Sequence, residues 1–341
     1  MRALVFHGPW TMSVEERPDP EPASGEVVIQ ILATGICGSD LHGFTGENGR
    51  RHPGQVMGHE TVGRVLAAET PALVGQLVTV NPVLGCGGCA ACQAGSTQRC
   101  GRRRVIGVTP GISSAFAERM VVPVANVVPL PEMAAHLGTL VEPLAVGYHA
   151  TVRAEVGPDD RVLVIGGGPI GQACALAARR RGATGIVVSE YGASRRSALE
   201  RLGFGVVDPG SADIETAVRE QLGEPASVVL DAVGASGSLA DAFAASDLGA
   251  RVVLIGMQSP QINLAAYDIS TEERTLIGSF SYSPQEFRDT ALWMAANLDP
   301  LAPLVDATVE LDEAPEAFRR LASGEWSASK VLVMAGPAVH S

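Results

Sequence analysis

The sequence has 341 residues, of which 46% are hydrophobic and 18% are charged, and its formal net charge is −12. This length allows two domains of ordinary size, and the composition is that of a globular rather than a disordered chain. The acidic balance argues against a nucleic-acid partner or an acidic membrane surface, because either would favour a basic face.

No apolar run reaches the eighteen or so residues that a membrane helix needs. The first ten residues lack the long apolar centre and the small-residue cleavage site of a secretory signal. Four of the six cysteines lie in one short segment. In a reducing compartment such crowding indicates metal binding rather than disulfides. We therefore expect a cytoplasmic protein.

Residues 1 to about 140 predict short strands separated by glycine, proline and other turn residues. The strand-like runs are Glu26–Leu32, Glu60–Leu66, Gln76–Val80 and Ala117–Val122. This texture predicts an irregular, mostly antiparallel β-domain.

Beyond Pro158, strand-like and helical runs alternate, with a strand about every 20 to 25 residues. The strands are expected at Arg161–Ile165, Ile186–Glu190, Val206–Asp208, Ser227–Asp231, Arg251–Ile255 and Thr275–Phe280. Helices such as Ile170–Arg181 and Ser194–Leu202 fill the gaps. The alternation predicts right-handed βαβ crossovers and a doubly wound parallel sheet, so the fold class is α/β with two domains. Two helical runs and a closing strand, Lys330–Met334, end the chain.

Two short segments of the β-domain carry side chains that can bind a metal. They are Cys37-Gly38-Ser39-Asp40-Leu41-His42 and Gly58-His59-Glu60. A lone histidine is more often structural than a ligand. Together, however, the segments offer a thiolate, an imidazole and a carboxylate, the ligand set of a catalytic zinc that keeps one position open. Glu142 adds a carboxylate just before the second domain.

The most specific metal signal is a run of four cysteines: Cys86, Cys89, Cys92 and Cys100. Two-residue gaps let successive thiolates converge on one ion, and four thiolates close a tetrahedral shell. The run therefore predicts a structural zinc. An iron–sulfur cluster is the alternative, although its fourth cysteine normally lies closer. Three arginines follow and are expected at the surface or against another subunit: Arg102, Arg103 and Arg104.

A glycine-rich turn joins the first strand of the second domain to a helix. Its residues are Gly166, Gly168, Pro169, Ile170 and Gly171. In such a turn the first glycine permits the tight bend, the second lets the backbone approach a pyrophosphate, and the third lets helix and strand pack closely. The helix N-terminus supplies amide donors. A structural turn is the alternative, but the strand before and the helix after favour a dinucleotide site.

Glu190 lies at the end of the next strand, near the distance expected for a carboxylate that binds the ribose. A carboxylate there repels a 2′-phosphate, which favours NAD over NADP. Arg195 and Arg196 follow closely and weaken this preference, because arginine can receive a 2′-phosphate.

Together these motifs resemble those of the zinc-containing medium-chain dehydrogenases, the superfamily of the alcohol, sorbitol and threonine dehydrogenases. The resemblance covers the full length and includes the E-P-L sequence that begins at Glu142. It implies a GroES-like catalytic domain over residues 1–145 and 282–341, and an inserted Rossmann domain over residues 146–281. It also implies two zinc ions per subunit, one catalytic and one structural, and NAD as cofactor.

The resemblance assigns roles to the metal-binding segments. Cys37 and His59 match the catalytic zinc ligands. Glu60 and Glu142 match two carboxylates of the polyol-dehydrogenase branch, either of which contacts the metal directly or through water.

Asp40 matches the residue that steadies a ligating histidine. Ser39 matches the hydroxyl that takes the substrate proton, and His42 matches the relay that passes it to solvent. The resemblance thus implies that zinc lowers the pKa of an alcohol, that Ser39 accepts its proton, and that the carbinol carbon gives a hydride to the nicotinamide.

Segments later in the chain match regions that surround the nicotinamide. They contribute Ile255, Gly256 and Phe280 as further cofactor-binding residues. Cys174 lies inside the helix after the glycine turn, and we expect it to be an inert packing residue.

Two departures concern the substrate. Sorbitol-type enzymes carry an aromatic residue and an arginine where this chain has Gly43 and Ser281, so sorbitol itself is doubtful. Arg50 and Arg51, in the loop between the zinc segments, could recognise a carboxylate or phosphate on the substrate. The favoured interpretation is that both are merely exposed.

The sequence therefore predicts a zinc-dependent, NAD-linked dehydrogenase of secondary alcohols or polyols. The alternatives are an enzyme of the L-threonine 3-dehydrogenase kind, a zinc-free reductase of the same superfamily, and a non-catalytic NAD-binding regulator. Relatives of this length are often tetramers and sometimes dimers, so we expect a homo-oligomer and favour the tetramer.

Overall fold

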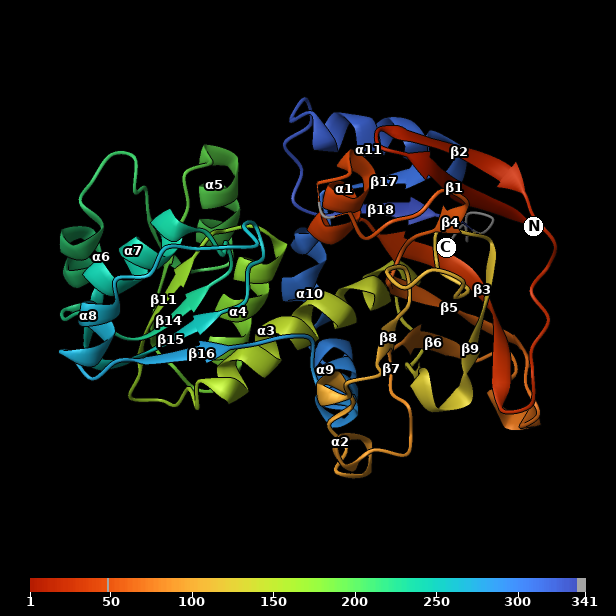
Figure 1. Ribbon diagram of the computed structural model, residues 1–341, viewed down its shortest axis with the longest axis horizontal. Coiled ribbons are helices and arrows are strands. Elements are labelled where there is room, and N and C mark those ends of the chain that lie inside the picture. The colour runs from red at the N-terminus through yellow and green to blue at the C-terminus, as the bar shows by residue number, and fades with distance from the viewer. Residues whose placement is uncertain (48, 336–341) are drawn as a thin grey trace. The chain divides into compact units, whose positions relative to one another are not determined.

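The computed structural model describes residues 1–47 and 49–335 (Figure 1). They form two compact units. One comprises Met1–Glu142 and the described residues from Ser283 onward, and the other comprises Pro143–Tyr282. None of the helices in the described part of the chain combines the length and the apolar character that a membrane-spanning helix needs.

The first unit is rich in β-structure, as predicted. Its strands are β1 (Arg2–Gly8), β2 (Thr11–Glu16), β3 (Glu26–Gly35), β4 (Gln55–Val56), β5 (Glu60–Ala67), β6 (Leu77–Val80), β7 (Val83–Leu84), β8 (Arg104–Val105), β9 (Arg119–Pro123), β10 (Val127–Pro129), β17 (Ala307–Glu310) and β18 (Val331–Met334). Its helices are α1 (Gly38–Thr45), α2 (Ala90–Gln93), α9 (Pro284–Ala295), α10 (Leu298–Leu301) and α11 (Ala314–Ala322). The prediction of two helical runs in the C-terminal segment missed α10 and strand β17.

The main sheet of this unit brings distant segments together. Its strand order is β10-β6-β5-β3-β18-β17, with β9 also paired to β3. Antiparallel pairing places Gly35, the last residue of β3, opposite Glu60, the first residue of β5. Gly35 also pairs with Leu332 of β18. The ends of three strands therefore meet where the metal-binding segments begin.

The second unit is a six-stranded parallel sheet with the order β13-β12-β11-β14-β15-β16. The strands are β11 (Arg161–Ile165), β12 (Gly185–Ser189), β13 (Gly205–Val207), β14 (Ala226–Asp231), β15 (Ser246–Leu254) and β16 (Thr275–Gly278). The helices are α4 (Pro169–Arg180), α5 (Ala193–Arg201), α6 (Ile214–Leu222), α7 (Ser236–Ala244) and α8 (Ala266–Ser270). A further helix, α3 (Val141–Arg153), begins at the end of the first unit.

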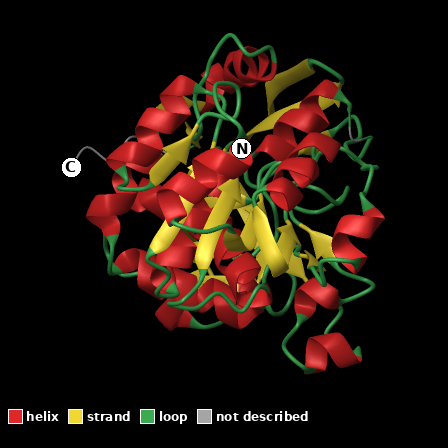
Figure 2. Ribbon diagram, turned by 90° about the vertical axis from the view of Figure 1, so that its left-hand side faces the viewer, coloured by secondary structure: helices red, strands yellow, loops and turns green. Residues whose placement is uncertain are grey.

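Helices cover both faces of this sheet (Figure 2). The strand order reverses beside β11, which is the doubly wound arrangement that the sequence predicts. Its central strands are apolar on both faces: the paired residues Leu163 and Val229 are buried on one face, and the paired residues Val164 and Leu230 are buried on the other. The carboxyl end of β11 is therefore held firmly in the core, and it positions the glycine turn that follows it.

Candidate active site and metal centres

Cys37, His59 and Glu60 form the first candidate metal centre. Their ligand atoms all lie within 4.8 Å of one another. Cys37 caps the N-terminus of α1, and His59 and Glu60 stand at the start of β5. The glycine at position 35 makes this approach possible, because a Cβ there would meet Glu60 Oε2 at 2.1 Å. The fold thus brings together the two segments that carry these three side chains.

Asp40 lies between two of these side chains. It is fully buried, its Oδ2 accepts a hydrogen bond from the Cys37 backbone N–H at 3.2 Å, and its Oδ1 lies 3.6 Å from His59 Nδ1. Burial opposes ionisation of both groups, yet their mutual attraction prevails: the pKa of Asp40 is lowered and that of His59 is raised. Because Nδ1 faces Asp40, Nε2 is the imidazole atom available to a metal.

Glu60 pairs with a lysine that the motif analysis did not single out. Lys330 Nζ donates to Glu60 Oε2 at 2.5 Å and to the Ile36 carbonyl at 3.4 Å. Lys330 is 3% exposed, and it is the single lysine among the 25 basic residues of the chain. That rarity is the signal in the sequence that could have drawn attention to it.

Glu60 Oε1 is buried and has no hydrogen-bond partner. Burying a carboxylate oxygen without a partner destabilises the fold, and a bound cation at this atom would remove that cost. The thiol, the imidazole and the carboxylate form a mixed donor set that suits zinc and supplies three protein ligands, as a site with one open position requires. The residues therefore fit the implied metal.

The remaining predicted members of this site lie around the cluster. Glu142 is buried in the first turn of α3 and acts on Lys330 electrostatically, but it is not in the close group of ligand atoms. Ser39 and His42 lie three residues apart on α1 and so share a side of the helix. His42 Nδ1 bonds Glu47 Oε2 at 2.6 Å, and its side chain is half exposed.

The interpretation that Arg50 and Arg51 are both exposed is wrong for Arg51. Its side chain is 1% exposed, and its Nη2 donates to Asp40 Oδ1 at 3.3 Å. Arg50 is exposed, as expected. The loop sequence alone could not distinguish the two neighbours, because the partner of Arg51 lies eleven residues earlier on another element.

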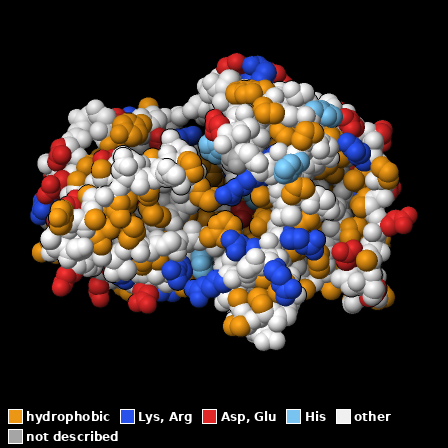
Figure 3. Space-filling view, viewed as in Figure 1, with side chains coloured by type: hydrophobic (Ala, Val, Ile, Leu, Met, Phe, Trp, Pro, Cys, Tyr) orange, Lys and Arg blue, Asp and Glu red, His pale blue; other side chains and the backbone are white. Residues whose placement is uncertain are grey.

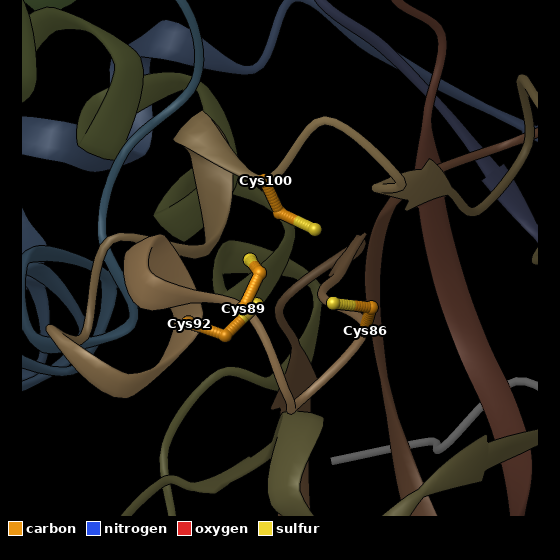
Figure 4. A group of neighbouring side chains, drawn as sticks. All are labelled: Cys86, Cys89, Cys92 and Cys100. Carbon is orange, nitrogen blue, oxygen red and sulfur yellow. The ribbon is translucent and has the colours of Figure 1, made fainter.

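The four-cysteine segment forms the second candidate metal centre (Figure 4). The four sulfur atoms lie within 4.8 Å of one another, and the cysteines are free of disulfides. Three of the residues are half-buried and Cys100 is buried. Arg102 is exposed, as expected, but its Nη2 also contacts Cys86 Sγ at 3.3 Å. The backbone N–H of Gly88 and the Cys100 thiol lower the pKa of Cys86 to about 6, which favours the thiolate that a metal binds.

The glycine turn has the geometry of a phosphate cradle. Gly166 adopts φ 91°, a conformation that favours glycine, and a Cβ at Gly171 would meet the Gly166 carbonyl oxygen at 1.7 Å. Gly168 caps α4, and a Cβ there would meet no protein atom within 4 Å. The space beside Gly168 is thus open to a ligand at the helix N-terminus, where Pro169 and Ile170 follow.

Glu190 is held at the end of β12 by two backbone amides. Its Oε2 accepts from Gly167 N at 2.7 Å and its Oε1 accepts from Gly192 N at 2.6 Å. Arg195 Nη1 lies 3.8 Å from Glu190 Oε2. Arg196 is occupied locally, because it bonds backbone carbonyls of Glu190 and Tyr191 and pairs with Asp208. The two arginines therefore differ in their freedom to receive a phosphate.

The last predicted cofactor residues follow the next strands of this unit. The backbone N–H groups of Ile255 and Gly256 both donate to the Asp231 carbonyl at 3.0 Å. A Cβ at Gly256 would meet the Val233 backbone at 2.1 Å, so packing alone accounts for that glycine. Phe280 is 38% exposed after β16. Cys174 is fully buried, and burial raises the pKa of its thiol to about 12, which agrees with an inert packing role.

Comparison with known proteins yields two family matches. Residues 23–132 match the family described as Alcohol dehydrogenase GroES-like domain, and residues 169–296 match the family described as Zinc-binding dehydrogenase. The chain is 31% identical to L-galactonate-5-dehydrogenase of Escherichia coli over 299 residues, which is 86% of this chain and 87% of that protein. It is 29% identical to D-xylulose reductase A of Aspergillus niger over 338 residues, or 95% and 94% of the two chains.

A solved structure resembles the chain over nearly its whole length. An alcohol dehydrogenase (rspB) of Escherichia coli in complex with NADH superposes with a TM-score of 0.89 at 26% identity, covering 98% of this chain and 99% of that chain. These findings confirm the predicted two-domain fold and the predicted zinc and NAD, and they do not favour the threonine-dehydrogenase or non-catalytic alternatives. The chain belongs to the zinc-containing medium-chain dehydrogenases and is a zinc-dependent enzyme that transfers a hydride between a secondary alcohol or polyol and NAD.

Proposed function

We propose that Cys37, His59 and Glu60 hold the catalytic zinc and that Cys86, Cys89, Cys92 and Cys100 hold the structural zinc. The observation that carries the first assignment is the buried, unpartnered Glu60 Oε1 beside the thiol and the imidazole. Because Lys330 already occupies Oε2, Glu60 would bind through Oε1 alone. Glu142 lies outside the close group and would act on the same site from farther away, together with Lys330.

When bound, zinc would supply a Lewis acid that lowers the pKa of the substrate hydroxyl. Ser39 Oγ would accept the proton of that hydroxyl, and His42, one helical turn later and half exposed, would release it to solvent. Glu47 holds His42 Nδ1, which leaves Nε2 for the relay. Asp40 would fix the orientation of the His59 ring.

The cofactor would lie on the glycine turn, with its pyrophosphate beside Gly168 and the N-terminus of α4. The ribose would meet Glu190, whose fixed negative charge disfavours a 2′-phosphate. Of the two nearby arginines, Arg195 is the one that could reach a phosphate, because Arg196 is tied to backbone carbonyls and Asp208. Ile255, Gly256 and Phe280 would contribute to the nicotinamide end of the site.

The substrate that we propose is a polyol or a sugar acid that is oxidised at a secondary hydroxyl. The relatives are named for L-galactonate, which is a sugar acid, and for D-xylulose, a ketose whose reduction gives a polyol. Arg51 would not be the residue that binds an anionic substrate, because its guanidinium is buried against Asp40. Sorbitol is disfavoured by Gly43 and Ser281, which replace the aromatic residue and the arginine of sorbitol-type enzymes.

The experiment is to follow NADH formation with secondary alcohols, polyols, sugar acids and 3-hydroxy amino acids, with NAD and NADP in parallel. We expect turnover with at least one polyol or sugar acid and a higher kcat/KM with NAD. Turnover with threonine alone, or with simple alcohols alone, would contradict the proposed substrate class. No turnover in zinc-replete protein would contradict the assigned catalytic centre.

We further propose that the subunit assembles with copies of itself through the second unit. Strand β16 ends its sheet and has one paired neighbour among the described strands, and unpaired edges invite pairing. Hydrophobic side chains gather on the face of this unit seen in Figure 3. Exposed hydrophobic residues in and after β15 and in α8 include Leu248, Met257 and Tyr267. Light scattering after size-exclusion chromatography tests the self-association, with a tetramer expected ahead of a dimer.

We also propose a cytoplasmic location, because a reducing cytoplasm would keep the cysteines of both metal sites as thiols.

A further inference from the structure

Arg51 is a buried cation in a chain whose other arginines are mostly at the surface. Its side chain is 1% exposed, and its Nε has no hydrogen-bond partner. Removing a charged group from water costs several kcal/mol unless close partners compensate. A buried Arg51 therefore requires a negatively charged partner. Within the described residues, Asp40 is the one carboxylate with which Arg51 forms an ion pair.

Asp40 is the residue through which Arg51 reaches the candidate zinc ligands. Asp40 Oδ1, which receives Arg51 Nη2, is the same oxygen that faces His59 Nδ1. The other oxygen, Oδ2, accepts the backbone N–H of Cys37. One carboxylate thus lies beside both ligand residues, and Arg51 holds it by the oxygen that faces His59.

The guanidinium is also anchored to α1 itself and occupies a space that the helix leaves for it. Arg51 Nη2 contacts the Ser39 carbonyl at 3.4 Å. A Cβ at Gly43, on the next turn of α1, would meet Arg51 Cγ at 2.6 Å and Nε at 3.0 Å. Gly43 lies within α1 and does not have a positive φ. The three atoms nearest to such a Cβ all belong to Arg51, so a larger side chain there would meet Arg51 first.

We propose that Arg51 is a positioning residue of the catalytic zinc site: it supplies the permanent counter-charge of Asp40 and holds its carboxylate where it orients His59 and Cys37. The proposal rests on the zinc assignment made above. Arginine suits the task because its planar fork keeps a fixed geometry and its charge is permanent. Gly43 leaves the space that the Arg51 side chain occupies.

The test measures zinc release rather than activity alone. Wild type, Arg51→Gln, Arg51→Lys and the surface control Arg64→Gln are incubated with a chelator, and retained zinc is measured over time. Cys37→Ala, which should lack the catalytic zinc, shows how fast zinc leaves the four-cysteine site alone. We expect one zinc of Arg51→Gln to leave about 10 to 100 times faster than in wild type, because loss of a residue that orients a metal ligand typically weakens metal binding by such a factor. The second zinc should be unaffected, and Arg51→Lys should fall between.

Gly43→Ala gives an independent arm, because its Cβ would displace Arg51 without removing it. It should hasten zinc release in the wild-type background and have little effect when Arg51→Gln is already present. If Arg51→Gln does not fold, Arg51→Lys and Gly43→Ala carry the test alone.

Zinc release at the rate of Arg64→Gln in the Arg51 variants and in Gly43→Ala would overturn the role of Arg51 and leave the zinc assignment standing. If Cys37→Ala itself keeps two zinc ions, both the assignment and the role of Arg51 are wrong. Cobalt substitution adds a spectroscopic check: the absorption of the thiolate-bound ion should change in Arg51→Gln and stay unchanged in Arg64→Gln.

Discussion

The two candidate metal centres are built in opposite ways. The cysteine centre takes all four ligands from one segment, and three of them are half-buried. Arg102, which contacts Cys86 Sγ, is exposed and belongs to the same segment. The mixed centre takes Cys37 from the N-cap of α1, just after β3, and takes His59 and Glu60 from the start of β5. Its supporting charges are buried, and the Glu60–Lys330 pair joins residues that are 270 positions apart.

The two centres differ in how the negative charge of their side chains is compensated. Water and an exposed arginine can offset the charge of thiolates near the surface. Water does not reach a buried carboxylate, so Glu60 and Asp40 each need a buried cation. Lys330 pairs with Glu60, and Arg51 pairs with Asp40. A closed structural centre can therefore be local in sequence, whereas an open centre depends on the whole fold of its unit.

Removal of one cysteine ligand should have the largest effect on stability. Cys92→Ala should lose one zinc and lower the melting temperature by about 10 °C or more, because a structural zinc contributes its binding energy to folding. Scanning calorimetry together with metal analysis measures both. If Cys92→Ala keeps two zinc ions and its full melting temperature, the cysteine centre is not a structural zinc site.

Loss of Lys330 should come next. Lys330→Met leaves Glu60 as a buried charge without its cation, which should cost about 3–5 kcal/mol of unfolding free energy in the metal-free protein. Urea unfolding of wild type, Lys330→Met, Glu60→Gln and the double variant measures the coupling between the two residues. Additive effects of the two single substitutions would show that the pair does not interact.

The pH dependence of the same pair has a defined sign. Burial lowers the pKa of Lys330, but Glu60 and Cys37 raise it, and the net direction is upward. The contribution of the pair is therefore fully present below the ordinary lysine value of about 10.4 and is lost as pH rises through the raised value. On the alkaline side, the difference in stability between wild type and Lys330→Met should therefore persist up to the ordinary lysine value and shrink above it.

The glycine turn can be compared with the two metal centres, because its residues, like those of the cysteine centre, lie in one short segment. Gly168→Ala should leave the melting temperature unchanged and weaken NAD binding about tenfold or more, because only a ligand would meet the new methyl group. Gly171→Ala is the contrasting variant and should damage folding, since its Cβ meets the Gly166 carbonyl. Calorimetric titration with NAD distinguishes the two, and equal NAD affinity of Gly168→Ala and wild type would argue against the proposed cradle.

Cys174 belongs to neither centre and should show the smallest effect. Burial raises the pKa of its thiol to about 12, so the folded protein keeps a proton that the unfolded chain releases above about pH 8.5. Stability should therefore fall slightly as pH rises beyond that value. Iodoacetamide should leave Cys174 unmodified in the folded protein at pH 8 and modify it after unfolding, as mass spectrometry would show. Rapid modification of the folded protein would contradict its burial.

The comparison of the two centres also explains what the sequence could predict. The four cysteines, the glycine turn and the alternation of strands and helices are local patterns, and each was read without knowing the fold. Cys37, His59 and Glu60 were found as motifs, but their convergence needed the family resemblance or the pairing of β3 with β5.

The supporting residues of the mixed centre escaped sequence reasoning for a physical reason. Lys330 lies in a segment without a motif, and Arg51 looks like any polar loop residue until α1 is seen to bury it. Ion pairs of this kind depend on tertiary contacts, which periodicity and spacing do not report. The rarity of lysine in this chain was the one available hint.

The measurement that tests the two-centre account most directly is the zinc content of Cys37→Ala, made alongside NAD affinity and NADH formation. The account predicts one zinc per subunit, NAD affinity close to that of wild type, and loss of turnover by about a thousandfold or more. Two zinc ions in Cys37→Ala, or full activity in that variant, would contradict it.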